Sequence, residues 1–281
     1  MRTNFFILVM AVVVATLFSG CEDNGPMPPT NIPVPPTNIT DDNGSLVEIR
    51  GRIDNVRARK SVPDPGDSPK QFYSLRFSDL DPGSYTIHMC VEKVVDDETV
   101  VFDIAQAAVS KNGDFALKMP TAVESEWLDN IPEGTERLWE MTDWNHVELD
   151  GIPDEIEISN PEAEMCVADL YMERAEDGQR FYLYYGGPDK ESYHTTDLSA
   201  VSSSGLLFTS AAVEIVGKSE SKMYPEQPYG MPRAFDITST EGWSWVHYVV
   251  NGMSSYLGWT TVYPDWAVMS YSAQAIYNDT P

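Results

Sequence analysis

Apolar and polar residues alternate with a period of two along most of the chain, and this pattern predicts β-strands. Between positions 47 and 54, apolar or small residues occupy the odd positions and charged residues the even ones, as expected for a strand with one buried face. Similar segments cover residues 72–77, 85–94, 99–108 and 114–119, and later 165–171, 181–185, 206–216, 234–237, 243–250, 257–263 and 266–277. The chain is therefore expected to be mainly β.

Turn sequences separate several of these segments. Pro82-Gly83 suits the centre of a type II turn, and Asn112-Gly113 and Asp177-Gly178 are typical of short connections between neighbouring strands. Because such connections join antiparallel neighbours, we expect antiparallel sheet.

Residues 121–160 break the alternation and are rich in Trp, Glu and Asp. Thr121 and Glu124 have the spacing of a helix capping box, and Pro132 is expected to limit the helix that follows. We therefore predict two antiparallel β-sandwich-like domains, residues 46–120 and 161–281, joined by an acidic, partly helical connector at residues 121–160.

The first residues have the layout of a signal peptide. Arg2 precedes an almost unbroken apolar run from Phe5 to Phe18, and small Ser19 and Gly20 follow it. The run is shorter than the roughly 20 apolar residues of a membrane-spanning helix, which disfavours a permanent transmembrane anchor. An ordinary secretory signal is the other alternative. Residues 1–20 are predicted to be removed.

The segment Leu17-Phe18-Ser19-Gly20-Cys21 resembles the lipobox of bacterial lipoproteins. The resemblance implies a diacylglycerol on the Cys21 sulfur, cleavage before Cys21 and membrane anchoring through acyl chains. Residues 21–45 then form a lipidated, proline-rich stalk, in which the pentapeptide Pro-Pro-Thr-Asn-Ile occurs at 28–32 and again at 35–39. Proline favours extended chain, so this segment is predicted to act as a spacer.

The charge balance narrows the choice of partner. The chain has 44 Asp and Glu against 18 Lys and Arg, a net charge of −26. Such a chain repels nucleic acid and anionic headgroups. Cationic ligands, divalent ions or neutral glycans are better candidates, although dispersed carboxylates also serve solubility alone.

Two cysteines remain beyond Cys21. Cys90 and Cys166 both lie in strand-like segments and are a disulfide candidate in an extracytoplasmic compartment. Two separate buried thiols are the alternative.

No motif nominates a catalytic centre. The histidines are scattered at positions 88, 146, 194 and 247 without zinc-type spacing, and no nucleophile elbow or phosphate-binding loop occurs. The short Asp79-Leu-Asp81 segment is better interpreted as a turn than as a calcium loop. We therefore expect no catalytic residue, metal or cofactor, although two carboxylates placed by the fold would suffice for a glycosidase.

Aromatic residues gather in the last 39 residues. Exposed on a sheet face, Trp243, Trp245, Trp259 and Trp266 could stack on sugars, which makes them the candidate ligand-binding residues. The alternation favours core packing instead, because Trp243 and Trp245 share one strand face with His247 and Val249.

Three segments, Ile158-Ser-Asn160, Phe235-Asp-Ile237 and Glu241-Gly-Trp-Ser-Trp-Val246, resemble parts of uncharacterised Bacteroidetes surface lipoproteins with an immunoglobulin-like N-terminal β-domain. The pieces 80–85 and 112–117 likewise resemble small immunoglobulin-like domains of the collagen-adhesin type. Acidic Glu22 and Asp23 are similar to signals for the outer face of the outer membrane, and a periplasmic orientation stays open.

The resemblance implies the fold type and surface tethering, and it brings no catalytic residue. We predict a non-enzymatic outer-membrane lipoprotein whose β-domains bind a glycan or a protein partner at the envelope. An extracellular polysaccharide hydrolase and a structural accessory of an envelope complex are the alternatives.

Overall fold

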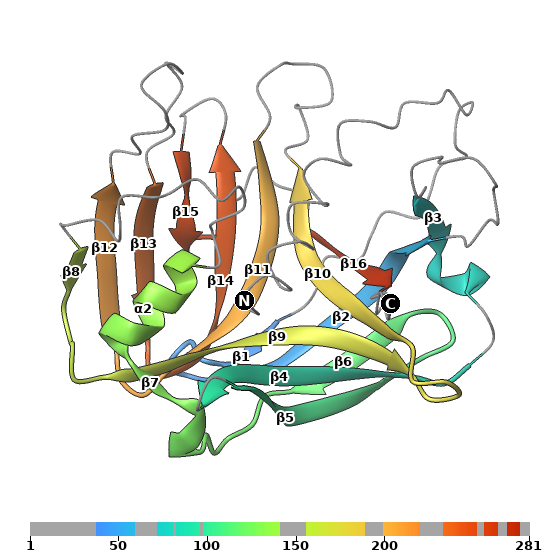
Figure 1. Ribbon diagram of the computed structural model, residues 1–281, viewed down its shortest axis with the longest axis horizontal. Coiled ribbons are helices and arrows are strands. Elements are labelled where there is room, and N and C mark those ends of the chain that lie inside the picture. The colour runs from blue at the N-terminus through green and yellow to red at the C-terminus, as the bar shows by residue number, and fades with distance from the viewer. Residues whose placement is uncertain are drawn as a thin grey trace.

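The computed structural model describes residues 38–59, 72–80, 83–95, 98–140, 156–188, 199–219, 233–251, 256–263 and 269–275 of the 281-residue chain. Within these ranges the protein is mainly β, as predicted, and its strands join in one large mixed sheet (Figure 1). Among the same residues, no helix is both long enough and apolar enough to cross a membrane.

The elements follow one another along the chain with two short 3-10 helices, η1 and η2, among the strands. In order they are β1 (Ile39–Thr40), β2 (Leu46–Arg59), β3 (Phe72–Arg76), η1 (Phe77–Asp79), β4 (Tyr85–Val95), β5 (Glu98–Val109), β6 (Asp114–Lys118), η2 (Ser125–Trp127), β7 (Asp129–Asn130), α2 (Ile131–Glu140), β8 (Ile156–Ile158), β9 (Glu164–Arg174), β10 (Arg180–Pro188), β11 (Ser199–Thr209), β12 (Val213–Ser219), β13 (Arg233–Ser239), β14 (Gly242–Asn251), β15 (Tyr256–Thr260) and β16 (Ser270–Ala275).

The main path through the sheet runs β1-β2-β16-β10-β9-β11-β14-β15-β13-β12-β8. Most neighbours are antiparallel, but β16 pairs with β2 in parallel, and so does β13 with β15. The predicted single strand 206–216 is two strands, because β11 ends at Thr209 and the chain turns before β12 begins at Val213.

Both faces of the sheet are buried in places. On β14, Trp245 and Val249 belong to the larger core, which the curled sheet encloses, whereas Val246 and Tyr248 belong to a second core on the opposite face. The second core also contains Ile131 and Leu138 of α2, which lies over this face in Figure 1. The alternation of side chains in β14 thus serves two cores at once.

The predicted division into two sandwich domains is not seen. Strand β2 from the first half pairs with β16 near the end of the chain, and β4 pairs with β9. The larger core takes residues from both halves. The two-domain division is therefore not confirmed, because alternation shows which face of a strand is buried but not which strand lies beside it.

The predicted connector does contain a helix, but at a different place. Residues 121–124 are not helical, and α2 begins at Ile131. The side chain of Asn130 caps this helix by accepting a hydrogen bond from the N–H of Glu133 at 3.0 Å. Pro132 therefore lies in the first turn, where a missing N–H costs little, and starts the helix instead of ending it.

The predicted stalk boundary at residue 45 is also too late. Ile39 of β1 pairs with Glu48 of β2, and Ser45 is buried. Residues 38–45 therefore belong to the folded body, whereas residues 1–37, including the predicted signal peptide, Cys21 and most of the predicted stalk, lie outside the described residues.

Candidate functional site

The tryptophans that sequence analysis singled out do not form an exposed shelf. Trp243, Trp245 and Trp259 are only 2%, 7% and 3% exposed, and Trp266 lies outside the described residues. Trp243 and Trp245 lie in the larger core and Trp259 in the second, where its indole N–H donates to the carbonyl oxygen of Leu138. Core packing, favoured by the alternation, is confirmed for these three, and surface stacking is excluded.

The candidate disulfide is not formed. Cys90 and Cys166 are both buried, and no bond joins their sulfur atoms. Cys90 is paired across the strands with Asp169, three residues further along β9 than Cys166. Burial, and then the neighbouring Asp169 charge, raise the pKa of the Cys90 thiol well above its ordinary value, so this thiol is a poor nucleophile.

A different group of side chains converges on the outer face of β5, β4, β9 and β10, opposite the larger core. Alternate residues of β4 such as Ile87 and Met89 face the core, so the residues between them, His88 and Glu92 among them, face outward. Cross-strand pairing then aligns His88 with Tyr171 of β9, and Tyr171 with Tyr182 of β10. We define the outer polar strip as His88, Glu92, Asp103, Gln106, Asp169, Tyr171, Glu173, Arg180, Tyr182 and Tyr184.

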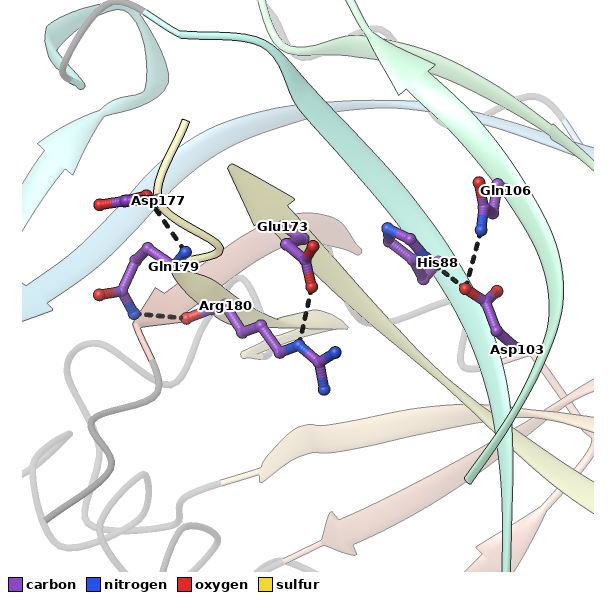
Figure 2. Close-up of polar contacts among 7 residues, drawn as sticks. All are labelled: His88, Asp103, Gln106, Glu173, Asp177, Gln179 and Arg180. Atoms are coloured by element: carbon purple, nitrogen blue, oxygen red, sulfur yellow. Dashed lines mark hydrogen bonds and ion pairs between the residues drawn. The ribbon is translucent and has the colours of Figure 1, made fainter. Parts of the chain in front are cut away.

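A hydrogen-bonded group of three forms one end of the outer polar strip (Figure 2). Nδ1 of His88 lies 2.6 Å from Oδ2 of Asp103, and Nε2 of Gln106 donates to the same carboxylate oxygen at 2.8 Å. Asp103 accepts from the His88 ring, which leaves Nε2 of the imidazole as the acceptor when the ring is neutral. The hairpin of β4 and β5 brings these residues together, since His88 pairs with Gln106 and Cys90 with Asp103.

Tyr171 lies at the centre of the strip. Its ring stacks on His88 with centroids 4.6 Å apart and planes 3° from parallel, and the guanidinium carbon of Arg180 lies 4.9 Å from the ring centroid. Arg180 also forms an ion pair with Glu173 at 2.8 Å (Figure 2). Burial, with the Asp103 charge second, raises the pKa of Tyr171 to about 12. These contacts fix the side chains in place.

Two carboxyl groups in the strip hold their protons unusually tightly. Burial raises the pKa of Asp169 to about 6, and burial together with the Asp169 charge raises that of Glu92 to about 7. Each of the two groups is therefore able to donate or accept a hydrogen bond near neutral pH.

Two further tyrosines extend the strip along β10. Tyr182 and Tyr184 are half-buried, with ring centroids 6.4 Å apart and planes tilted by 49°. Burial is the main cause that raises the pKa of Tyr182 to about 12, with Glu92 and Asp169 adding to it. Tyr182 thus lies near the two carboxyl groups.

Sequence analysis missed this site. The alternation in residues 85–94 does place His88 and Glu92 on one face, and that was the available signal. The pairing of β4 with β9, across a gap of more than 70 residues, leaves no trace in that pattern. Within the described residues, no three His, Cys, Asp or Glu side chains are grouped as metal ligands.

Comparison with protein families, with curated proteins and with solved structures found no match to this chain.

Proposed function

We propose that this protein is a lipid-anchored, non-enzymatic glycan-binding protein of the bacterial cell envelope, and that the outer polar strip holds the glycan. The observation that carries the proposal is the ring pair of Tyr182 and Tyr184, in which Tyr182 lies near the carboxyl groups of Asp169 and Glu92. Flat rings stack on sugar faces, and planar polar side chains exchange hydrogen bonds with sugar hydroxyls.

The composition of the strip favours a glycan over a protein partner. Protein interfaces concentrate apolar and aromatic residues at a dry centre, whereas the centre of the strip contains Tyr171 among His88, Arg180 and Asp169. The net charge of −26 favours a neutral glycan over an acidic one.

The anchor completes the proposal. A diacylglycerol on Cys21 and a proline-rich spacer would hold the folded body at the outer membrane, facing either the exterior or the periplasm. In this arrangement the body carries the binding surface and the lipid supplies the location.

The proposal is tested with the soluble chain from Glu22 onward and a panel of neutral polysaccharides in affinity electrophoresis. Wild-type protein should be retarded by at least one polysaccharide, and Tyr184→Ala and Tyr182→Ala should each weaken binding by about 1–3 kcal/mol through lost contact area. The control is Val216→Ala, because Val216 is 47% exposed on β12, away from the strip. Retention by no polysaccharide, or unchanged retention of both tyrosine variants, contradicts the proposal.

Polysaccharide hydrolysis is a second candidate function for the same strip. The observation that favours it is the pKa of Glu92, about 7, because a carboxylic acid that keeps its proton near neutral pH can protonate a leaving group. Glu92→Gln should then abolish the release of reducing ends while binding persists. If wild-type protein releases no reducing ends from a polysaccharide that it binds, the hydrolase is excluded.

A further inference from the structure

Aromatic rings and uncharged polar groups gather at one end of the larger core, on the face opposite the outer polar strip. Tyr185 of β10 stacks on Tyr271 of β16 with centroids 4.6 Å apart, and the ring of Trp245 of β14 lies 4.7 Å from that of Tyr185. The His247 ring follows on β14, 6.3 Å from Trp245 and nearly parallel to it. All four side chains are buried.

Within the part of the chain that the structure describes, two polar atoms in this group have no hydrogen-bond partner. They are Nε1 of Trp245 and the hydroxyl oxygen of Tyr271, whose residues are 7% and 1% exposed. Buried polar groups are nearly always hydrogen-bonded, because an unpaired one loses its hydration without compensation. Phenylalanine at either position would avoid that loss. Retained polar groups of this kind are expected where a site awaits a ligand.

Other polar side chains lie in the same group as Trp245 and Tyr271. Burial raises the pKa of Tyr271 well above its ordinary value, and the nearby phenols of Tyr185 and Tyr263 raise it further. Oγ of Ser204 on β11 lies 2.7 Å from Nδ1 of His247. Burial lowers the pKa of His247 to about 4, so its ring is uncharged at neutral pH.

Tyr263 links this group to solvent. It follows β15, is 51% exposed, and meets the His247 ring edge-on at 6.0 Å. The position beside the His247 ring is therefore held by a side chain that is half in water.

We propose that these residues form a second binding site, which takes one neutral sugar ring. The ring takes the place of the Tyr263 side chain over His247 and accepts hydrogen bonds from Nε1 of Trp245 and the hydroxyl of Tyr271. The site consists of Tyr185, Ser204, Trp245, His247, Tyr263 and Tyr271.

The chemistry of the group selects this ligand class. An ionic ligand would lie among uncharged groups without a counter-charge, which is costly. A purely apolar ligand would leave Trp245 and Tyr271 unpaired. A neutral sugar offers both a face for the aromatic rings and oxygens for the two donors.

The site is tested with the soluble chain from Glu22 onward by ligand-observed NMR titration against glucose, galactose, mannose, fucose and N-acetylglucosamine. At least one should bind with a Kd of about 1 mM or tighter. Trp245→Phe and Tyr271→Phe keep a ring and remove one donor, so each should weaken that binding about tenfold. Val216→Ala, on β12 and outside both sites, should leave that binding unchanged. If Tyr182→Ala weakens the binding and neither phenylalanine variant does, the sugar lies on the outer polar strip, which overturns this site but not the proposed function.

Thermal unfolding without sugar supplies a second readout. Tyr271→Phe should leave the Tm unchanged or raise it, because the deleted hydroxyl has no partner in the free protein. Absence of binding to every sugar, wild-type affinity of both phenylalanine variants, or a lowered Tm of Tyr271→Phe each overturns the proposal.

Discussion

The hydroxyl oxygen of Ser45 accepts a hydrogen bond from the backbone N–H of Trp243 at 2.9 Å, across 198 positions of the sequence. The indole N–H of Trp243 donates in turn to the carbonyl oxygen of Pro120 at 3.1 Å. Three distant parts of the chain therefore meet at one buried tryptophan. This contact is the local counterpart of the sheet pairing that unites the two halves.

Ser45→Ala should destabilise the protein by about 1–3 kcal/mol, because it leaves the buried N–H of Trp243 without its acceptor. Urea denaturation monitored by circular dichroism measures the change in the free energy of unfolding. A change within error would mean that this N–H finds another partner.

The neighbouring Gly242 gives a sharper test of the same contact. Its φ is +107°, and a Cβ atom there would lie 2.1 Å from Oγ of Ser45. Gly178 is the matched control, since its φ is +71° and nothing lies within 4 Å of an added Cβ. Gly178→Ala should cost only the left-handed backbone strain, about 1–2 kcal/mol, and Gly242→Ala clearly more. Equal losses would contradict the close packing of Ser45 on Gly242.

The sequence predicted which face of each strand is buried better than it predicted which strands lie side by side. The alternation in residues 243–250 correctly separated Trp245 from Val246, which belong to different cores. The glycine turns at Gly113 and Gly178 were correctly placed, and both residues have positive φ. Local patterns carry this information because the side chains of a strand alternate whatever its partner is.

The candidate site could not be predicted from the sequence for the same reason. The contact of His88 with Asp103 depends on a register shift between Met89 and Cys90 in the β4–β5 hairpin, and its stacking on Tyr171 depends on a long-range pairing. Neither feature changes the pattern of apolar and polar residues. The number of tryptophans near the end of the chain suggested a binding surface, but those in the described residues of that region are buried and pack in the cores.

Acid should destabilise the protein through His247. Burial lowers its pKa from 6.5 to about 4 in the folded state, so the unfolded chain binds the proton more tightly. The stabilising contribution is therefore complete above pH 6.5 and is lost as the pH falls from 6.5 to 4, by about 3 kcal/mol. Urea titrations across this range, with His247→Gln for comparison, isolate the effect. The free energy of unfolding of His247→Gln should lack this part of the pH dependence. An identical pH dependence in the variant and the wild type would contradict the lowered pKa of His247.

Glu92 should act in the opposite sense. Its pKa rises from 4.5 to about 7 on folding, so the folded state binds the proton more tightly and stability falls as the pH rises from 4.5 through 7. Glu92→Gln should raise the Tm at pH 8 and change it little at pH 4. Glu98→Gln, at an exposed position of β5, is the control. A lower Tm of Glu92→Gln at pH 8 would show that the ionised carboxylate is favourable.

The proposed lipid anchor is tested by its chemistry. Mass spectrometry of the mature protein should find a diacylglycerol-modified and acylated Cys21 at the amino terminus, and Cys21→Ala should leave unprocessed or soluble protein. An unmodified amino terminus at any other residue would refute the anchor.

The two copies of the pentapeptide should differ in their effect on stability. The first, residues 28–32, precedes the described residues, whereas the second, residues 35–39, ends at Ile39, which pairs with Glu48 in the sheet. Replacement of residues 28–32 by a glycine-serine segment of equal length should leave the Tm within error, because a spacer contributes no packing. The same replacement of residues 35–39 should lower the Tm, because it removes the Ile39 side chain and puts flexible residues into the paired strand. Thermal unfolding of the two soluble variants measures both values. A fall in Tm for the first variant would show that the stalk packs on the body, and an unchanged Tm for the second would show that β1 adds nothing to its stability.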